Sequence, residues 1–303
     1  MRSKIIAALL GAVVAASGVV VGGVVGGAVA QADPACPSLY VVAIPGTWET
    51  TTGRVPGPGM LSDATDGLPS NVQVDYVSYA ATAFPWESEV YGRSKKQATD
   101  NGRGFIQAMA QRCGNTRIAL LGYSQGADAA GDLAAEIGSG LGVVPPTKLA
   151  AVGLISDPRR SESDALVGPF VPGSGAGGPR IGGFGLASSQ TRTICAVGDL
   201  YCSTPKDDFV TRFAGFLAQS SDPSPAQFSR YTQEALAIFN DLMLSGGIPL
   251  LQSQLSDPAN EKRAEQLEQF YRSQVHTDYR NYSVDGSGTS ATRWMRNWLR
   301  DAA

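Results

Sequence analysis

The chain has 303 residues, 43% of them hydrophobic, and a formal net charge of −3 at pH 7. A chain of this length and hydrophobic content can bury a full core, in one large domain or two small ones, which argues against disorder over most of it. Its mild acidity argues against nucleic acid as a partner, because the phosphate backbone attracts basic surfaces.

The N-terminal segment has the pattern of a secretory signal. Arg2 and Lys4 precede a long uncharged run that ends in small residues, and the next charged residue is Asp33. We therefore predict a signal peptide over residues 1–32 and an exported domain over residues 33–303, secreted or associated with the cell envelope. Loss of Arg2 and Lys4 would change the net charge from −3 to −5. The uncharged run is longer than in most signal peptides, so a retained N-terminal anchor is the alternative.

Short aliphatic runs then alternate with helical patterns. Several of the runs are apolar on both faces, as the strands of a covered parallel sheet are. The predicted strands are residues 39–45, 71–79, 116–122, 148–156 and 191–197. Helical patterns over residues 92–112 and 125–138 separate some of them. The sequence therefore predicts an α/β domain with a central parallel sheet covered by helices.

Two segments interrupt this alternation. Residues 166–190 are rich in Gly and Pro and predict a long surface loop. Their glycine spacing is not a dinucleotide fingerprint, because no predicted strand leads into it and no predicted helix follows, so we expect no cofactor. Residues 206–275 have a helical pattern throughout, with start signals at Pro225 and Pro258.

All four cysteines lie in the exported part, an even number for an oxidising compartment. Four cysteines allow three pairings. We favour the Cys195–Cys202 pair because it closes a short local loop, which leaves Cys36 to pair with Cys113. A metal site is not expected, since the chain has one histidine and no Cys-x-x-Cys spacing.

The segment around Ser124 carries the strongest functional signal. Gly122, Ser124 and Gly126 join a predicted strand directly to a predicted helix. In an esterase elbow the nucleophilic serine stands on such a turn, and the glycines are needed because the strained backbone and the close helix exclude side chains. We therefore predict Ser124 as the nucleophile.

A serine hydroxyl needs a base, most often histidine, and His276 is the only histidine in the chain. The imidazole needs a carboxylate that fixes its tautomer, expected between Ser124 and His276 in chain order. Two aspartates stand at predicted strand ends. We prefer Asp199, because a disulfide would stiffen its loop. Asp157 is the alternative, although before Pro158 it also suits a turn.

The developing oxyanion needs preorganised hydrogen-bond donors. The backbone N–H of Gln125, directly after the nucleophile, is the first candidate. The second is expected from the loop after the first strand, where Gly46 and Thr47 lie. A simple strand-ending turn is the alternative reading of that loop.

At this point the sequence resembles a known family. The segments ACPSLYVVAIPGTWE, GYSQGA, ICAVGDLYC and VHTDY together are similar to the cutinase family of serine esterases, most of all to its exported members in mycolic-acid-making actinobacteria. The resemblance runs from about Cys36 to Asp208 and again from Val275 to the C-terminus. It implies the same catalytic residues, oxyanion residues and disulfides: Ser124, Asp199 and His276; Thr47 and Gln125; Cys36 with Cys113 and Cys195 with Cys202.

The chain departs from that family in one respect. Small cutinases join the acid and the histidine by a short loop, whereas this chain inserts residues 206–275. A comparable helical insertion is known in related phage esterases that cut mycolate from arabinogalactan. Because the insertion leaves the loop of Asp199 and returns into His276, we interpret it as a lid or wall that contacts the lipid chains of the substrate, with Gly246 and Gly247 as a hinge.

These patterns predict a secreted carboxylic-ester hydrolase of α/β-hydrolase type that forms an acyl-enzyme on Ser124. The expected substrates are lipid or mycolate esters at the cell envelope or a membrane surface, followed by phospholipids or thioesters. Two other classes remain open: an acyltransferase that moves a lipid acyl group to a sugar, and a non-catalytic envelope-binding protein, which would be expected to lack a member of the triad. We expect a monomer.

Overall fold

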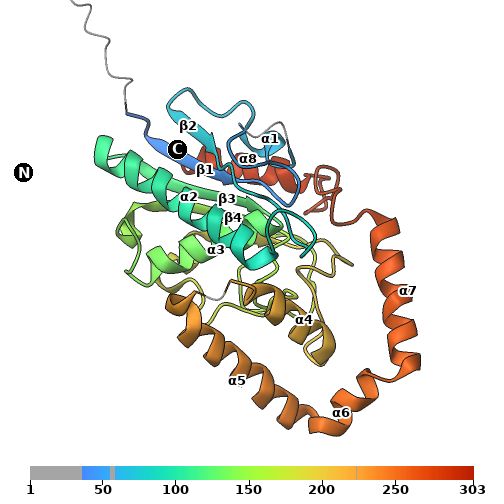
Figure 1. Ribbon diagram of the computed structural model, residues 1–303. Coiled ribbons are helices and arrows are strands. Elements are labelled where there is room, and N and C mark those ends of the chain that lie inside the picture. Colours follow the sequence, from blue (N-terminus) through green and yellow to red (C-terminus); the bar gives the residue numbers. More distant parts are fainter. Residues whose placement is uncertain (1–35, 55–58, 223) are drawn as a thin grey trace, which may run out of the picture. The chain divides into compact units, whose positions relative to one another are not determined.

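The computed structural model describes residues 36–54, 59–222 and 224–303 (Figure 1). The predicted signal peptide, residues 1–32, lies outside the described residues. Within the described ranges, no single helix is long and apolar enough to span a membrane. Two helices, α5 (Phe228–Ser245) and α6 (Gly247–Gln254), meet that criterion only as a pair, and the pair is bent by 96°.

Five parallel strands form the central sheet, in the order β2-β1-β3-β4-β5. The strands are β1 (Leu39–Ile44), β2 (Val72–Tyr76), β3 (Arg117–Tyr123), β4 (Leu149–Ile155) and β5 (Thr191–Ile194). The predicted α/β fold with a parallel sheet is therefore confirmed. Two strands are at least three residues shorter than predicted: β2 ends at Tyr76, and β5 ends at Ile194, where a disulfide-closed loop begins.

Helices cover both faces of the sheet, which explains why its strands are apolar on both sides (Figure 1). The covering helices are α1 (Ser62–Thr65), α2 (Tyr91–Arg112), α3 (Gln125–Gly138) and α8 (Ala291–Asp301). Val42 and the alternate residues of β1 pack with α2 and α3. Val41 faces the other way and packs with α1 and α8. The C-terminal α8 was not among the predicted elements.

The Gly- and Pro-rich segment, residues 166–190, lies only partly on the surface. Arg180 within it is buried among carboxylates, and Val171, Phe184 and Ala187 are buried as well, so the prediction of a surface loop was wrong at these four residues. Two 3-10 helices, η1 (Pro146–Lys148) and η2 (Gly185–Gln190), precede β4 and β5.

Residues 206–275 contain four α-helices and one 3-10 helix. In chain order these are α4 (Phe209–Gln219), η3 (Pro225–Gln227), α5, α6 and α7 (Asp257–Ser273). The expected start at Pro225 opens a 3-10 turn before α5, and Pro258 lies in the first turn of α7. The helices have a small core of their own, centred on Phe209, Ile238 and Leu242.

Two disulfides hold the ends of elements. Cys36 is bonded to Cys113 at the end of α2, and Cys195 to Cys202 across the loop after β5. These are the two pairs that the sequence analysis favoured.

Candidate active site

The site lies where three neighbouring strands end. β3, β4 and β5 are paired in register through Tyr123 with Ile155 and Ile155 with Ile194. The pairing continues one step further, because Ser124 N–H donates to Ile155 O (2.9 Å) and Ser156 N–H donates to Ile194 O (2.8 Å). Strand register therefore brings Ser124, Ser156 and the loop after Ile194 together.

Ser124 stands on a strained turn between β3 and α3. Its φ of 53° and ψ of −123° are rare for a residue with a side chain and fit a nucleophile elbow. The surrounding backbone leaves no room for a side chain at either flanking glycine. A Cβ on Gly122 would lie 2.4 Å from Gly126 O, and a Cβ on Gly126 would lie 2.0 Å from Ile44 O. The Gly-x-Ser-x-Gly spacing thus reflects the close packing of α3 on the sheet.

His276 follows α7 and faces the serine. Its Nε2 lies 2.9 Å from Ser124 Oγ, and its Nδ1 lies 3.0 Å from Asp199 Oδ2. The rings of Tyr123 and Tyr201 flank the imidazole at centroid distances of 5.4 and 4.6 Å. Tyr123 also donates a hydrogen bond to His276 O (2.7 Å). The structure therefore brings the predicted nucleophile, base and acid into one chain of contacts.

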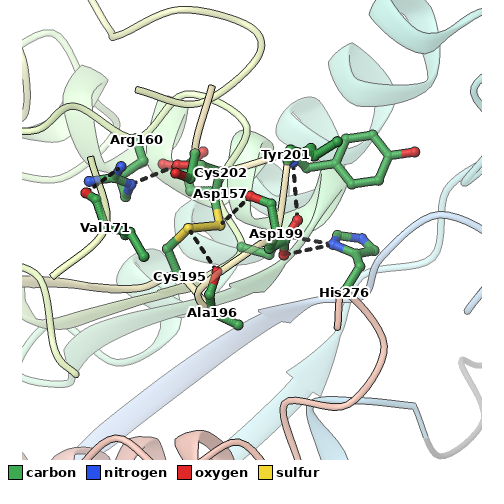
Figure 2. Close-up of a disulfide and its surroundings, with 12 residues drawn as sticks. Asp157, Arg160, Val171, Cys195, Ala196, Asp199, Tyr201, Cys202 and His276 are labelled. Carbon is green, nitrogen blue, oxygen red and sulfur yellow. Dashed lines mark hydrogen bonds and ion pairs between the residues drawn. A yellow bond between two sulfur atoms is a disulfide. The ribbon is translucent and has the colours of Figure 1, made fainter. Parts of the chain in front are cut away.

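Asp199 is fully buried beside the Cys195–Cys202 disulfide (Figure 2). Its Oδ1 accepts a hydrogen bond from Tyr201 N–H (3.0 Å). Burial raises the pKa of the Asp199 carboxyl, but the hydrogen bond and charge of His276, with two neighbouring hydroxyls, lower that pKa below its ordinary value. The carboxylate is therefore held in its ionised form, as an acid that orients an imidazole must be.

Those two hydroxyls were missed by the sequence analysis. Ser156 Oγ and Tyr279 Oη both donate to Asp199 Oδ2, over 2.6 and 2.7 Å. Tyr279 follows His276 by three residues within the VHTDY segment, so it could have been found there. Ser156 has no local signal, since its position depends on strand register alone.

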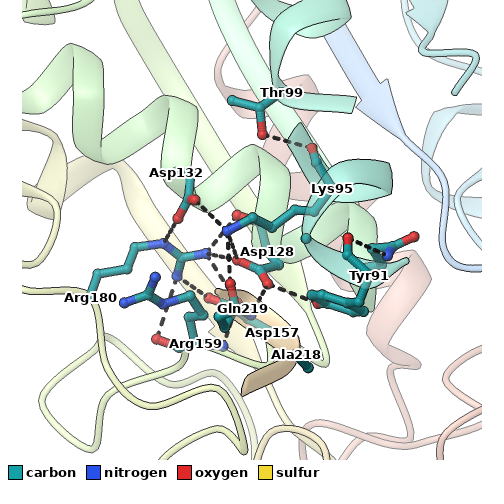
Figure 3. A network of polar contacts seen from close by, with 12 residues as sticks. Tyr91, Lys95, Thr99, Asp128, Asp132, Asp157, Arg159, Arg180, Ala218 and Gln219 are labelled. Atoms are coloured by element: carbon teal, nitrogen blue, oxygen red, sulfur yellow. Dashed lines mark hydrogen bonds and ion pairs between the residues drawn. The ribbon is translucent and has the colours of Figure 1, made fainter. Parts of the chain in front are cut away.

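Asp157, the alternative acid, lies in a network of buried charges (Figure 3). Both of its carboxylate oxygens accept hydrogen bonds from Arg180, over 2.6 and 3.2 Å, and Arg159 N–H donates to it over 2.9 Å. Burial raises the pKa of Asp157, although Arg180 opposes that rise. The structure thus places Asp157 against Arg180 and Asp199 against His276.

The predicted oxyanion residues come from the start of α3 and from the loop after β1. Gln125 is the first residue of α3, so its backbone N–H lies at the positive end of the helix. Its side chain is buried and donates to Thr82 O (3.0 Å). Thr47 is half-buried in the loop after β1. Glu49, also missed, fixes that loop by accepting a hydrogen bond from Gly46 N–H (2.8 Å).

Two cavities accompany the site. One of about 110 Å³ lies beside the loop that carries Asp199, and its lining includes Leu200, Tyr201, Leu267 and Phe270. Another of about 580 Å³ lies over the charged network, and no triad member lines either of these two cavities. In the part of the chain that the structure describes, no group of three or more His, Cys, Asp or Glu side chains could hold a metal ion.

Comparison with known proteins gives the family. A model described as Cutinase matches residues 35–224, more than half of the chain. The chain belongs to the cutinase family. The resemblance seen in the sequence is therefore confirmed, and the protein is a serine esterase of that family.

Its relatives include carboxylesterases of Mycobacterium and Corynebacterium. The chain is 32% identical over 207 residues to carboxylesterase Culp1 of Mycobacterium tuberculosis, covering 67% of this chain and 85% of that protein. It is 29% identical over 205 residues to the carboxylesterase Culp6 homolog of Corynebacterium glutamicum, covering 56% of this chain and 66% of that protein, just under two thirds of its length. The solved catalytic core domain of acetyl xylan esterase from Trichoderma reesei has a TM-score of 0.46 and 21% identity, covering 68% of this chain and 98% of that one.

Proposed function

We propose that the protein is an exported esterase that cleaves lipid or mycolate-type esters through an acyl-enzyme on Ser124. The observation that carries the catalytic part is the unbroken contact chain from Ser124 Oγ to His276 Nε2 (2.9 Å) and from His276 Nδ1 to Asp199 Oδ2 (3.0 Å). The two disulfides favour export, since such bonds persist in oxidising compartments.

The proposed reaction follows from this geometry. Ser124 Oγ attacks the ester carbonyl as His276 Nε2 takes its proton, and Asp199 stabilises the imidazolium that forms. The oxyanion accepts hydrogen bonds from the backbone N–H of Gln125 and from Thr47. His276 then protonates the leaving alcohol. Water, activated by the same imidazole, releases the acid from Ser124.

Exposed aromatic side chains beside the elbow support a substrate with hydrocarbon chains. Trp48 and Trp86 are 67% and 80% exposed, and Phe84 stacks between them at centroid distances of 6.1 and 4.8 Å. The hydrogen bond from Gln125 to Thr82 O places the start of the segment that carries Phe84 and Trp86 next to the nucleophile. A contiguous apolar rim at a binding site favours an apolar ligand.

The insertion supports the same proposal. α7 ends at the site, where Phe270 packs on Tyr201 (5.4 Å between centroids) and Tyr201 packs on His276. Residues 242–256 contain no charged side chain, and Leu244 within them is 88% exposed. We therefore propose that the insertion forms an apolar wall for the acyl chains of the substrate.

Hydrolysis of a panel of short-chain to long-chain acyl esters tests the proposal, with Ser124→Ala as the matched variant. Loss of the nucleophile should lower kcat by about 10⁴- to 10⁶-fold while the protein still folds. A fluorophosphonate probe should modify Ser124, as read by mass spectrometry. Modification of another serine, with full activity in the alanine variant, would exclude this site.

The same assay separates hydrolysis from transfer. With trehalose present, the acyl group should still be released as free acid. Acylated trehalose as the main product would replace the hydrolase proposal by a sugar acyltransferase that uses the same triad.

A further inference from the structure

Ser156 combines burial with an unfavourable backbone conformation. It is the first residue after β4 and is fully buried, and its φ is 53°. A residue with a side chain adopts this left-handed conformation at a cost in free energy that glycine avoids. Ser156 thus keeps a side chain at a position where glycine would be less strained.

The contacts of the Ser156 hydroxyl indicate what this side chain contributes. Ser156 Oγ donates to Asp199 Oδ2 over 2.6 Å and lies 3.0 Å from His276 Nδ1. His276 Nδ1 is itself 3.0 Å from the same Asp199 oxygen. Since the single hydroxyl hydrogen goes to the carboxylate, a lone pair of Oγ faces the Nδ1–H of the imidazole. The Nδ1–H is thus shared between two oxygens.

Tyr279 differs in this respect, although it donates to the same carboxylate oxygen over 2.7 Å. Its hydroxyl also accepts a hydrogen bond from Ala196 N–H (2.9 Å), which ties it to the loop after β5. Tyr279 therefore anchors the acid, whereas Ser156 contacts the acid and the base together.

We propose that Ser156 is a positioning residue of the triad: its hydroxyl holds Asp199 and the Nδ1 edge of His276 so that Nε2 faces Ser124. This inference rests on the proposed function. Ser156 acts through the imidazole and is not proposed to contact the substrate. Removal of the hydroxyl should therefore lower kcat and leave KM near its original value.

The first test compares Ser156→Gly with Ser156→Ala, using 4-nitrophenyl butyrate as substrate. Both variants lack the hydroxyl, but only glycine relieves the backbone. We expect kcat to fall roughly 10- to 100-fold in both, while the glycine variant unfolds at a higher temperature than the alanine variant. A glycine variant that keeps kcat within about twofold of the wild type, or losses that follow the unfolding temperature, would overturn the proposal.

A second test uses coupling to the acid. In an Asp199→Asn background the hydroxyl has lost the carboxylate that it orients, so Ser156→Gly should lower kcat by less than about threefold further. A loss as large as in the wild-type background would show that Ser156 does not act through the Asp199–His276 pair.

A third test does not depend on activity. His276 is the only histidine in the chain, so a protein labelled with ¹⁵N-histidine gives the NMR signals of one ring. In Ser156→Gly the Nδ1–H signal should broaden and exchange faster with water; an unchanged signal would contradict the proposal. If the wild-type protein neither cleaves the ester nor reacts with fluorophosphonate at Ser124, the proposed function fails, and the histidine spectra still decide the role of Ser156.

Discussion

At the scale of single residues, two aspartates that follow neighbouring strands have opposite surroundings. Asp199 meets an imidazole and two hydroxyls, which lower its pKa in spite of burial. Asp157 forms an ion pair with the buried Arg180, and burial leaves the pKa of Asp157 raised. The difference arises from the neighbouring strands and loops rather than from the residue type.

Substitution of Asn for Asp199 should therefore affect mainly kcat, whereas substitution of Asn for Asp157 should affect mainly stability. Asp199→Asn should lower kcat by about 10⁴-fold, because the imidazole loses the carboxylate that fixes its tautomer. Asp157→Asn should affect kcat far less but should reduce the free energy of unfolding by about 1 to 3 kcal/mol, since Arg180 keeps Asp128 and Asp132 but loses the carboxylate that accepts two of its hydrogen bonds. Ester kinetics and thermal unfolding of both variants check this, and the reverse ranking in kcat would transfer the acid role to Asp157.

At the scale of elements, the insertion is attached to the α/β core at its start as well as at His276. Lys95 on α2 donates to Gln219 at the end of α4 over 2.8 Å, and Arg159 forms a buried ion pair with Glu234 on α5 (Figure 3 shows the first part of this network). Buried charged contacts of this kind are costly to separate. They favour a fixed wall over a lid that moves as one body.

A wall of this kind should affect chain-length selectivity. Leu267 on α7 lines the cavity beside Tyr201, so Leu267→Asn should lower kcat/KM for long-chain esters roughly tenfold relative to butyrate, which corresponds to the loss of about two buried methylenes. Leu141→Asn, at a leucine that is 82% exposed outside the insertion, is the matched control. Equal losses on long and short esters would show that the insertion only supports the fold.

Secondary-structure elements of this chain could be predicted from the sequence more readily than contacts between distant residues. The strands could be predicted because they are apolar on both faces, and the elbow because its glycines are required by local packing. The disulfide pairs followed from loop length. Ser156 and Glu49 could not be found in this way, because their contacts depend on which strands and loops become neighbours. α8 was missed although Ser290 caps it by accepting a hydrogen bond from Arg293 N–H.

At the scale of the whole molecule, carboxyl groups whose pKa values are shifted in opposite directions determine how stability depends on pH. Burial raises the pKa of Asp132, but the positive charges of Lys95 and of three arginines hold it well below its ordinary value, and the pKa of Asp199 is also lowered. Their contribution to stability is present above the unfolded value of about 4 and is lost as pH falls further. Burial raises the pKa of Asp164 to about 6. In the folded state this group binds a proton that it releases on unfolding between about pH 6 and 4, so its contribution to stability increases as pH falls through that window.

The protein should therefore be most stable at mildly acidic pH, and Asp164 should account for part of that maximum. Denaturant unfolding between pH 7 and pH 3 should show a rise in the free energy of unfolding toward about pH 4 to 5 and a steep loss below about pH 4. Asp164→Asn should remove part of the rise between pH 6 and 4 and leave the loss below pH 4 in place, because the amide does not titrate while Asp132 and Asp199 still must be protonated. Asp66→Asn, at an exposed aspartate of another loop, is the control and should keep the wild-type profile. An Asp164 variant with an unchanged slope between pH 6 and 4 would show that this carboxyl is not the group that links folding to protons there.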